Sequence, residues 1–277
     1  MPKTVIRRVA CGHLVDSKQS VRVVAGTLAL AAVLALTSPA AADDAQPGGR
    51  SGPDDFRPRE DKLAFLVDRA RADAGVLPIA RAAALDRAAS AHADEMVADG
   101  YMDHDGPGGS TPASRAADAG YVTPAGGPWI VVEVISARGD QPEDALDWWL
   151  NDGLHRRVVL RSTWREMGIG FAAGRPYGRF WVMEFACRPD VLPPVLLDGT
   201  LSIPDENCGT AASSFGHVHD VRVAPDSASL ATADWQPYTA QLAWPGAASA
   251  TVEMRDGQGR DQQVAATDPG GSAVTGP

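Results

Sequence analysis

The sequence predicts an α/β domain of helices interleaved with buried strands, followed by a small all-β module. In the first part, apolar residues recur at helical spacing, and continuous apolar runs between these stripes indicate buried strands. In the second part the helical stripes disappear, and short alternating runs separated by turn residues replace them. Helices that precede and interleave with strands favour layers in which helices cover a sheet.

Four helices are predicted in the α/β part, each from an apolar stripe and an end signal. Gly75 and Gly100 follow the first two stripes, and Thr111-Pro112 gives the third helix an N-cap with proline at its first position. The predicted helices cover residues 63–75, 85–100, 111–120 and 142–150, with a further helical turn over 155–160.

Three strands are predicted in the same part: Trp129–Ile135, Met167–Ala172 and Phe180–Cys187. The first is apolar on both faces except at Glu133, which indicates a buried central strand. The third alternates, so that Trp181 lies on one face and Glu184 on the other.

Prolines and glycines divide the chain. Residues 60–190 are expected to form the α/β domain, and residues 211–264 a sandwich-like β module. We expect a flexible linker at 43–59, a Pro-rich linker at 191–210 and a disordered tail at 265–277.

The N-terminus has the pattern of a secretory signal peptide. Basic residues precede the apolar run Val23–Leu36, and small residues around Ala40 follow it, so residues 1–42 are interpreted as a cleaved signal. The alternative is a transmembrane anchor, but the run is short for a bilayer crossing of about 20 residues. The sequence therefore predicts a secreted, extracellular protein without stable membrane insertion after cleavage.

Removal of residues 1–42 changes the cysteine and charge counts. Cys11 leaves with the signal, and the remaining Cys187 and Cys208 are predicted to form a disulfide, with two free thiols as the alternative. The chain carries a net charge of −10, and residues 1–42 carry +4, so the remainder carries −14. This acidity disfavours nucleic acid and anionic membranes as partners.

Three residues are the candidate site: His104, Glu133 and His155. A carboxylate within an apolar strand is costly to bury unless something pairs with it, and the two imidazoles are the expected partners. Two imidazoles and a carboxylate can hold Zn²⁺ or another divalent cation with one position open for water. The alternative is a hydrogen-bonded cluster without metal.

The order of motifs from Phe65 to Cys187 resembles the bacterial form of the CAP superfamily, which comprises cysteine-rich secretory proteins, antigen 5 and pathogenesis-related proteins and is also called the SCP domain. The matching motifs are Tyr101–His104, Gly109–Pro112 through Arg115 to Gly120-Tyr121, Glu133, Trp149–Asn151, His155-Arg156, Glu166–Gly170 and Phe180-Trp181. The resemblance implies a three-layer α-β-α sandwich with a cleft lined by two histidines and a glutamate, which binds divalent metal in some members.

The chain departs from that family at several cleft positions. Val134 stands in place of the usual asparagine, and Asp152-Gly153-Leu154 in place of Ser-Pro-Gly. The second glutamate of animal and plant members is missing, and Asp152 and Glu184 are the candidates to replace it. These departures weaken the case for a retained cleft chemistry, and no catalytic residue is assigned.

The function that we expect is a non-enzymatic extracellular protein that binds an unidentified ligand or protein. One alternative is a metal-dependent extracellular hydrolase that uses His104, Glu133 and His155. The other is lipid or sterol binding, which the resemblance implies because some family members carry such ligands.

The remaining histidines and the C-terminal module carry less information. His92 lies on an apolar helical stripe and is interpreted as a core residue, while His217 and His219 are interpreted as a solvated face, with a surface metal site as the alternative. The segments Asp234–Tyr238 and Val252–Arg260 resemble immunoglobulin-like surface modules of exported bacterial proteins, which are mostly spacers or adhesive elements.

Overall fold

The computed structural model describes residues 59–123, 127–175, 178–205, 208, 214–245 and 249–268. The predicted signal peptide, the linker before Arg59 and the tail beyond Asp268 lie outside the described residues. Within the described ranges, no helix combines the length and the apolar character that a membrane crossing requires.

The α/β part is built on one four-stranded sheet with the strand order β1-β3-β4-β2. Its strands are β1 (Ala80–Arg81), β2 (Ile130–Ser136), β3 (Glu166–Gly174) and β4 (Gly178–Cys187). Strand β4 pairs antiparallel with both β2 and β3, and the short β1 pairs parallel with β3. The three predicted strands are thus confirmed.

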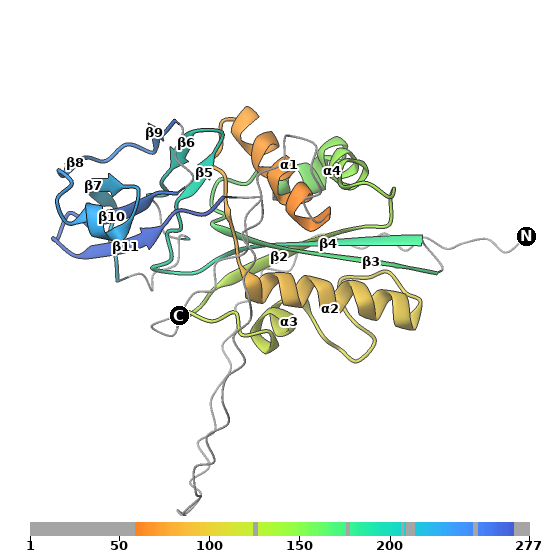
Figure 1. The fold of residues 1–277 in the computed structure, drawn as a ribbon. Coiled ribbons are helices and arrows are strands. Elements are labelled where there is room, and N and C mark those ends of the chain that lie inside the picture. Colours follow the sequence, from red (N-terminus) through yellow and green to blue (C-terminus); the bar gives the residue numbers. More distant parts are fainter. Residues whose placement is uncertain are drawn as a thin grey trace, which may run out of the picture. The chain divides into compact units, whose positions relative to one another are not determined.

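Helices cover both faces of this sheet, as Figure 1 shows for α1 and α4 on one side and α2 and α3 on the other. The helices are α1 (Arg59–Asp73), α2 (Ala83–Asp99), α3 (Pro112–Asp118), α4 (Pro142–Asn151) and α5 (Gly153–Val159). Helix α5 joins the α1 and α4 side, because its Val159 packs in the same apolar cluster as Val67 and Trp149. The predicted three-layer α-β-α sandwich is therefore confirmed.

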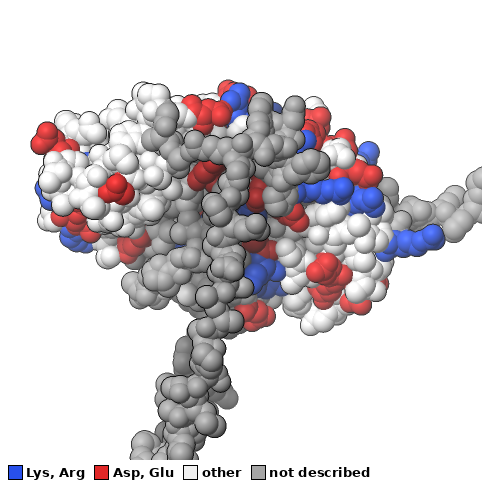
Figure 2. Space-filling model, in the orientation of Figure 1, with Lys and Arg blue, Asp and Glu red and all other residues white. Residues whose placement is uncertain are grey.

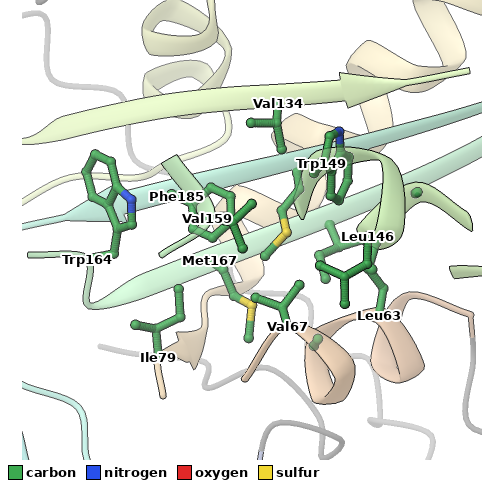
Figure 3. Packing of buried hydrophobic residues seen from close by; sticks show 14 of the residues in the cluster. Leu63, Val67, Ile79, Val134, Leu146, Trp149, Val159, Trp164, Met167 and Phe185 are labelled. Carbon is green, nitrogen blue, oxygen red and sulfur yellow. The ribbon is translucent and has the colours of Figure 1, made fainter. Parts of the chain in front are cut away.

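The main apolar core lies between the sheet and the α1/α4 layer (Figure 3). Trp149 of α4 is fully buried there, and its indole N–H donates to the backbone oxygen of Ile135 at 3.3 Å. Met167 and Phe185 supply the sheet side of the cluster. Truncating a buried tryptophan of this kind to alanine costs about 3–5 kcal/mol, so this face is the main anchor of the domain.

The opposite face holds α2 unusually close to the sheet. A Cβ atom at Gly168 would collide with the backbone of Leu85, and one at Gly170 would collide with the backbone of Ala89. Glycine is therefore required at both positions of β3. On the same side, α3 begins as predicted, with Thr111 accepting from the backbone N–H of Ser114 at 3.1 Å and Pro112 at the first helical position.

The C-terminal part consists of two further sheets with the strand orders β11-β10-β7-β8 and β5-β6-β9. Its elements are β5 (Val195–Leu197), β6 (Thr200–Ser202), β7 (Val218–Ala224), α6 (Ser227–Leu230), β8 (Gln236–Pro237), β9 (Gln241–Ala243), β10 (Thr251–Asp256) and β11 (Asp261–Ala265). This is the predicted β module.

The structure differs from the sequence prediction at the 191–210 segment, which was expected to be a linker. It contains β5 and β6, because Leu196 and Leu201 are buried in the same apolar cluster as Val252 of β10. The first residues of the segment predicted as a tail are also part of the fold, since Thr267 forms a parallel bridge with Val195. The prolines that suggested a linker lie just before β5.

Cys187 at the end of β4 is bonded to Cys208, with their Cα atoms 5.6 Å apart. The predicted disulfide is thus confirmed, and the alternative of two free thiols is excluded.

Candidate functional site

A buried polar cluster lies beneath the sheet on the α2/α3 side, and we call it the Glu133 centre. Its members are Glu133 of β2, Glu184 of β4, His92 of α2, Arg115 of α3 and His104 from the loop between these helices. Side chains alternate along β2, so Val134 points into the core around Trp149 while Glu133 points the other way. Only 1% of the Glu133 side chain is exposed.

Both carboxylate oxygens of Glu133 are engaged. Oε1 lies 2.8 Å from Nδ1 of His104, and Oε2 accepts a hydrogen bond from Nη2 of Arg115 at 2.9 Å. The same Arg115 nitrogen donates to the backbone oxygen of His104 at 2.9 Å. The three residues therefore form a closed triangle, in which a guanidinium compensates a carboxylate that would be very costly to bury alone.

His104 is the most accessible member of this triangle, with 30% of its side chain exposed. Partial burial alone would lower the pKa of its imidazole. The hydrogen bond and the negative charge of Glu133 outweigh that effect, so the pKa of His104 is raised above its ordinary value. The pair therefore favours an imidazolium–carboxylate contact.

Glu184 has the opposite environment although it lies next to Glu133. It is fully buried, and neither of its oxygens has a hydrogen-bond partner among the described residues. Burial raises the pKa of Glu184 well above its usual range, and the charge of Glu133 raises it further. This environment favours the protonated form of Glu184, whereas the sequence suggested a carboxylate lining a cleft.

His92 is confirmed as a buried residue of the α2 face. Its Nε2 lies 2.9 Å from the backbone oxygen of Asp103, and its Nδ1 lies 3.4 Å from the hydroxyl of Tyr101. That hydroxyl in turn donates to Glu95 at 2.7 Å. Nε2 of His92 also lies 3.7 Å from Oε1 of Glu133, so the His92 ring of α2 packs against this carboxylate.

His155 does not contact Glu133 as His104 does; its hydrogen-bond partner is Asp152. Its Nδ1 lies 2.8 Å from Oδ1 of Asp152, and its ring centre lies 4.5 Å from that of Trp148. Asp152 also accepts from the backbone N–H groups of Leu154 and His155 as the N-cap of α5. These bonds lower the pKa of Asp152. The structure thus joins His104 to Glu133, and joins His155 to the aspartate that replaces the family's serine.

The side chains present do not fit the predicted divalent metal site. Glu133, the carboxylate ligand in that prediction, has one oxygen on a guanidinium and the other on an imidazole. A cation bound there would face the positive charge of Arg115 at close range. Throughout the described ranges, no three or more His, Cys, Asp or Glu side chains form a group suited to a metal ion.

Arg115 is the member of this centre that sequence reasoning did not identify as functional. It is buried, and it lies in the short helix PASRAAD; a lone arginine among mostly small residues is the signal that could have indicated a special role. His217 and His219 behave as predicted for a solvated face, with 78% and 72% of their side chains exposed.

The fold and the Glu133 centre define a class: a three-layer α-β-α domain with a histidine–glutamate pair held under its sheet. Residues 65–185 match the family model described as "CAP: Cysteine-rich secretory protein family". This match falls on the part of the chain whose motifs carry the resemblance, and it supports that resemblance.

One similar sequence is "Uncharacterized protein YkwD" of Bacillus subtilis (strain 168), which is 24% identical over 135 residues. The match covers 49% of this chain and 49% of that protein, so the chain spans about half the length of the relative.

Similar solved structures include an extracellular protein containing an SCP domain from Bacillus anthracis str. Ames (22% identity, TM-score 0.40, 50% of this chain and 44% of that one). Another is an outer surface protein from Borrelia burgdorferi, with 16% identity and a TM-score of 0.40; the match covers 46% of this chain and 90% of that one. A third is a cysteine-rich secretory protein from Staphylococcus aureus subsp. aureus Mu50, with 14% identity and a TM-score of 0.35; the match covers 50% of this chain and 41% of that one.

Proposed function

We propose that the chain is an exported, non-enzymatic binding or interaction protein that uses its CAP domain as a rigid scaffold. The observation that carries the proposal is the occupation of both Glu133 oxygens by Arg115 and His104. Charge-assisted contacts of this kind, which join Glu133 of β2 to Arg115 of α3, stabilise a fold. The carboxylate of Glu133 is therefore engaged within the protein rather than available to bind or activate a substrate.

A metal-dependent hydrolase would need a different arrangement. Catalytic zinc sites use three protein ligands and keep one position open for water. Here the carboxylate is paired with a guanidinium, and His155 is turned to Asp152. The contacts of the candidate residues thus favour the non-enzymatic function over the hydrolase.

Two features support export. Residues 1–42 have the charge and apolar pattern of a signal peptide. The Cys187–Cys208 disulfide is typical of oxidising compartments outside the cytosol. For the β module we propose the role of a spacer or adhesive element, on its resemblance to immunoglobulin-like modules.

The test begins with the full-length protein purified from the medium of cells that express it. Metal content by mass spectrometry and hydrolysis of cell-wall polysaccharide and peptide substrates are measured for the wild type, His104→Ala and His155→Ala. We expect no stoichiometric metal and no hydrolysis in any of the three.

A bound metal that both substitutions remove, together with hydrolysis that they abolish, would overturn the proposal in favour of the hydrolase. Organic extraction of the same preparations tests lipid carriage. A stoichiometric lipid in the wild-type extract would make the protein a carrier instead. Protein retained inside the cells would contradict export.

A further inference from the structure

Helix α5 and the segment that follows its end carry three exposed arginines: Arg156, Arg157 and Arg161. None of them takes part in the ion pairs found among the described residues. The nearby carboxylate of Asp152 is engaged by His155 and by the backbone of α5. A chain with a net charge of −10 thus concentrates positive charge on one short helix.

The backbone at the end of α5 is held by hydrogen bonds from buried side chains. The buried Arg71 of α1 donates to the backbone oxygens of Val159 at 2.6 Å and Arg161 at 3.1 Å. The indole N–H of Trp164 donates to the backbone oxygen of Val158 at 2.7 Å. The end of α5 is therefore held in place before any partner arrives, which reduces the entropy lost on binding.

Further exposed and partly exposed side chains lie before α5 and at its start. Trp148 is partly exposed and stacks on His155, and the guanidinium carbon of the exposed Arg138 lies 5.9 Å from the centre of its ring. Leu154 is 48% exposed at the start of α5. We call this surface the α5 face; it comprises Arg138, Trp148, Leu154, Arg156, Arg157 and Arg161.

We propose that the α5 face binds an anionic polysaccharide outside the cell. This inference rests on the proposed function and names the partner class for it. Arg156 and Arg157 are adjacent on a helix, so their side chains diverge by about 100°. A polymer with repeated negative groups can reach both arginines, whereas a small anion would meet one. The ring of Trp148 adds an apolar contact for a sugar.

The distribution of charge favours a flexible strand over a flat anionic surface. Acidic side chains are spread over the face of the molecule seen in Figure 2, and Asp144 and Asp147 of α4, the helix before α5, are exposed. A membrane that met the α5 face would also bring carboxylates of α4 near its anionic headgroups, and like charges repel over about 8 Å at physiological salt. A single polysaccharide strand can contact the α5 face alone and avoid that repulsion.

The experiment measures binding of the full chain to dextran sulfate and to neutral dextran by biolayer interferometry at low and physiological salt. We expect binding to dextran sulfate only, weaker at higher salt. The double variant Arg156→Gln/Arg157→Gln should lose at least about tenfold in affinity, because it removes two charge-assisted contacts.

The matched control is Arg87→Gln in α2, on the other face of the sheet. Arg87 is exposed and, like the α5 arginines, belongs to none of the ion pairs of the described ranges. The control should bind as the wild type does, which separates a local site from a general effect of net charge. Thermal unfolding checks that each variant is folded.

Several outcomes would overturn the inference. These are no binding to dextran sulfate, equal loss in the α5 and control variants, or tighter binding to anionic vesicles or single-stranded DNA than to the sulfated polymer. None of these results bears on metal content or hydrolysis, so the inference can fail while the proposed function stands. Hydrolysis of polysaccharide by the wild type would instead contradict the proposed function.

Discussion

Glu133 and Glu184 lie directly opposite each other on β2 and β4, yet their carboxyl groups are in opposite states. Glu133 is compensated by Arg115 and His104, whereas Glu184 has no hydrogen-bond partner among the described residues and is fully buried. One guanidinium cannot fully compensate two adjacent carboxylates in a buried site. Burial and the neighbouring charge of Glu133 therefore raise the pKa of Glu184, which favours its protonated form.

Glu184→Gln should flatten the dependence of stability on pH. The pKa of Glu184 is raised in the folded protein. The contribution of this carboxyl group to the free energy of unfolding is therefore complete below its pKa in the unfolded chain, and it is lost as the pH rises toward its pKa in the folded protein. The wild type should thus lose stability as the pH rises above the unfolded pKa of about 4.3, by at most about 1.4 kcal/mol per pH unit for this group. Urea unfolding across this range should show a smaller slope for the variant.

Glu143→Gln serves as the control for that measurement, because the Glu143 side chain is 43% exposed and pairs with Lys62 at the surface. Surface pairs of this kind contribute little. Equal pH slopes for the wild type and Glu184→Gln would show that Glu184 is not the group that retains the proton.

Arg115→Met should be among the most damaging single changes in the domain. It leaves Glu133 buried with His104 as its remaining close partner, and removal of one member of a buried ion pair costs about 3–5 kcal/mol. The double variant Arg115→Met/Glu133→Gln should recover part of this loss, because the uncompensated charge is gone. Urea unfolding of the wild type, Arg115→Met, Glu133→Gln and the double variant gives the four free energies of unfolding from which the interaction energy between Arg115 and Glu133 is calculated.

Arg156→Met is the matched change at an exposed arginine of α5, and it should stay within about 0.5 kcal/mol of the wild type. If Arg115→Met were no more damaging than this control, the closed triangle would not contribute to stability.

Much of the fold could be predicted from the sequence because its signals are local. The apolar stripes indicated the helices, and the run around Glu133 indicated the central strand, since burial on both faces leaves a continuous apolar pattern. The segment containing β5 and β6 was missed because each strand has only three residues, too short for alternation to show. Its place in a sheet depends on pairing with β9, far along the chain.

The candidate site was predicted in part, for a related reason. Glu133 is recognisable as a charge in an apolar strand, and His104 was correctly assigned as its partner. The role of Arg115 and the pairing of His155 with Asp152 were not foreseen. Which cation compensates a buried carboxylate is decided by the approach of α3 to β2, a tertiary contact that no local pattern encodes.

The titration of His104 should report the contact with Glu133. Its pKa is raised by that carboxylate against the effect of burial, so the ring should titrate above the ordinary value for histidine. The stabilisation that it provides is complete below the unfolded pKa of about 6.5 and is lost as the pH rises through the folded pKa. Ring-proton NMR should show a lower pKa for His104 in Glu133→Gln, and an unchanged pKa would contradict the pairing.

Loss of the Cys187–Cys208 disulfide should destabilise the chain through its unfolded state. The bond joins residues 21 positions apart, and closure of a loop of that size contributes about 3 kcal/mol in the chain-entropy model. Cys208→Ser is the better variant, because Cys208 is 7% exposed and Cys187 only 1%, so a serine hydroxyl is less completely buried at position 208. Urea unfolding of Cys208→Ser should match that of the wild type reduced with a phosphine. If the reduced and oxidised wild type unfolded at the same urea concentration, the bond would contribute nothing to stability.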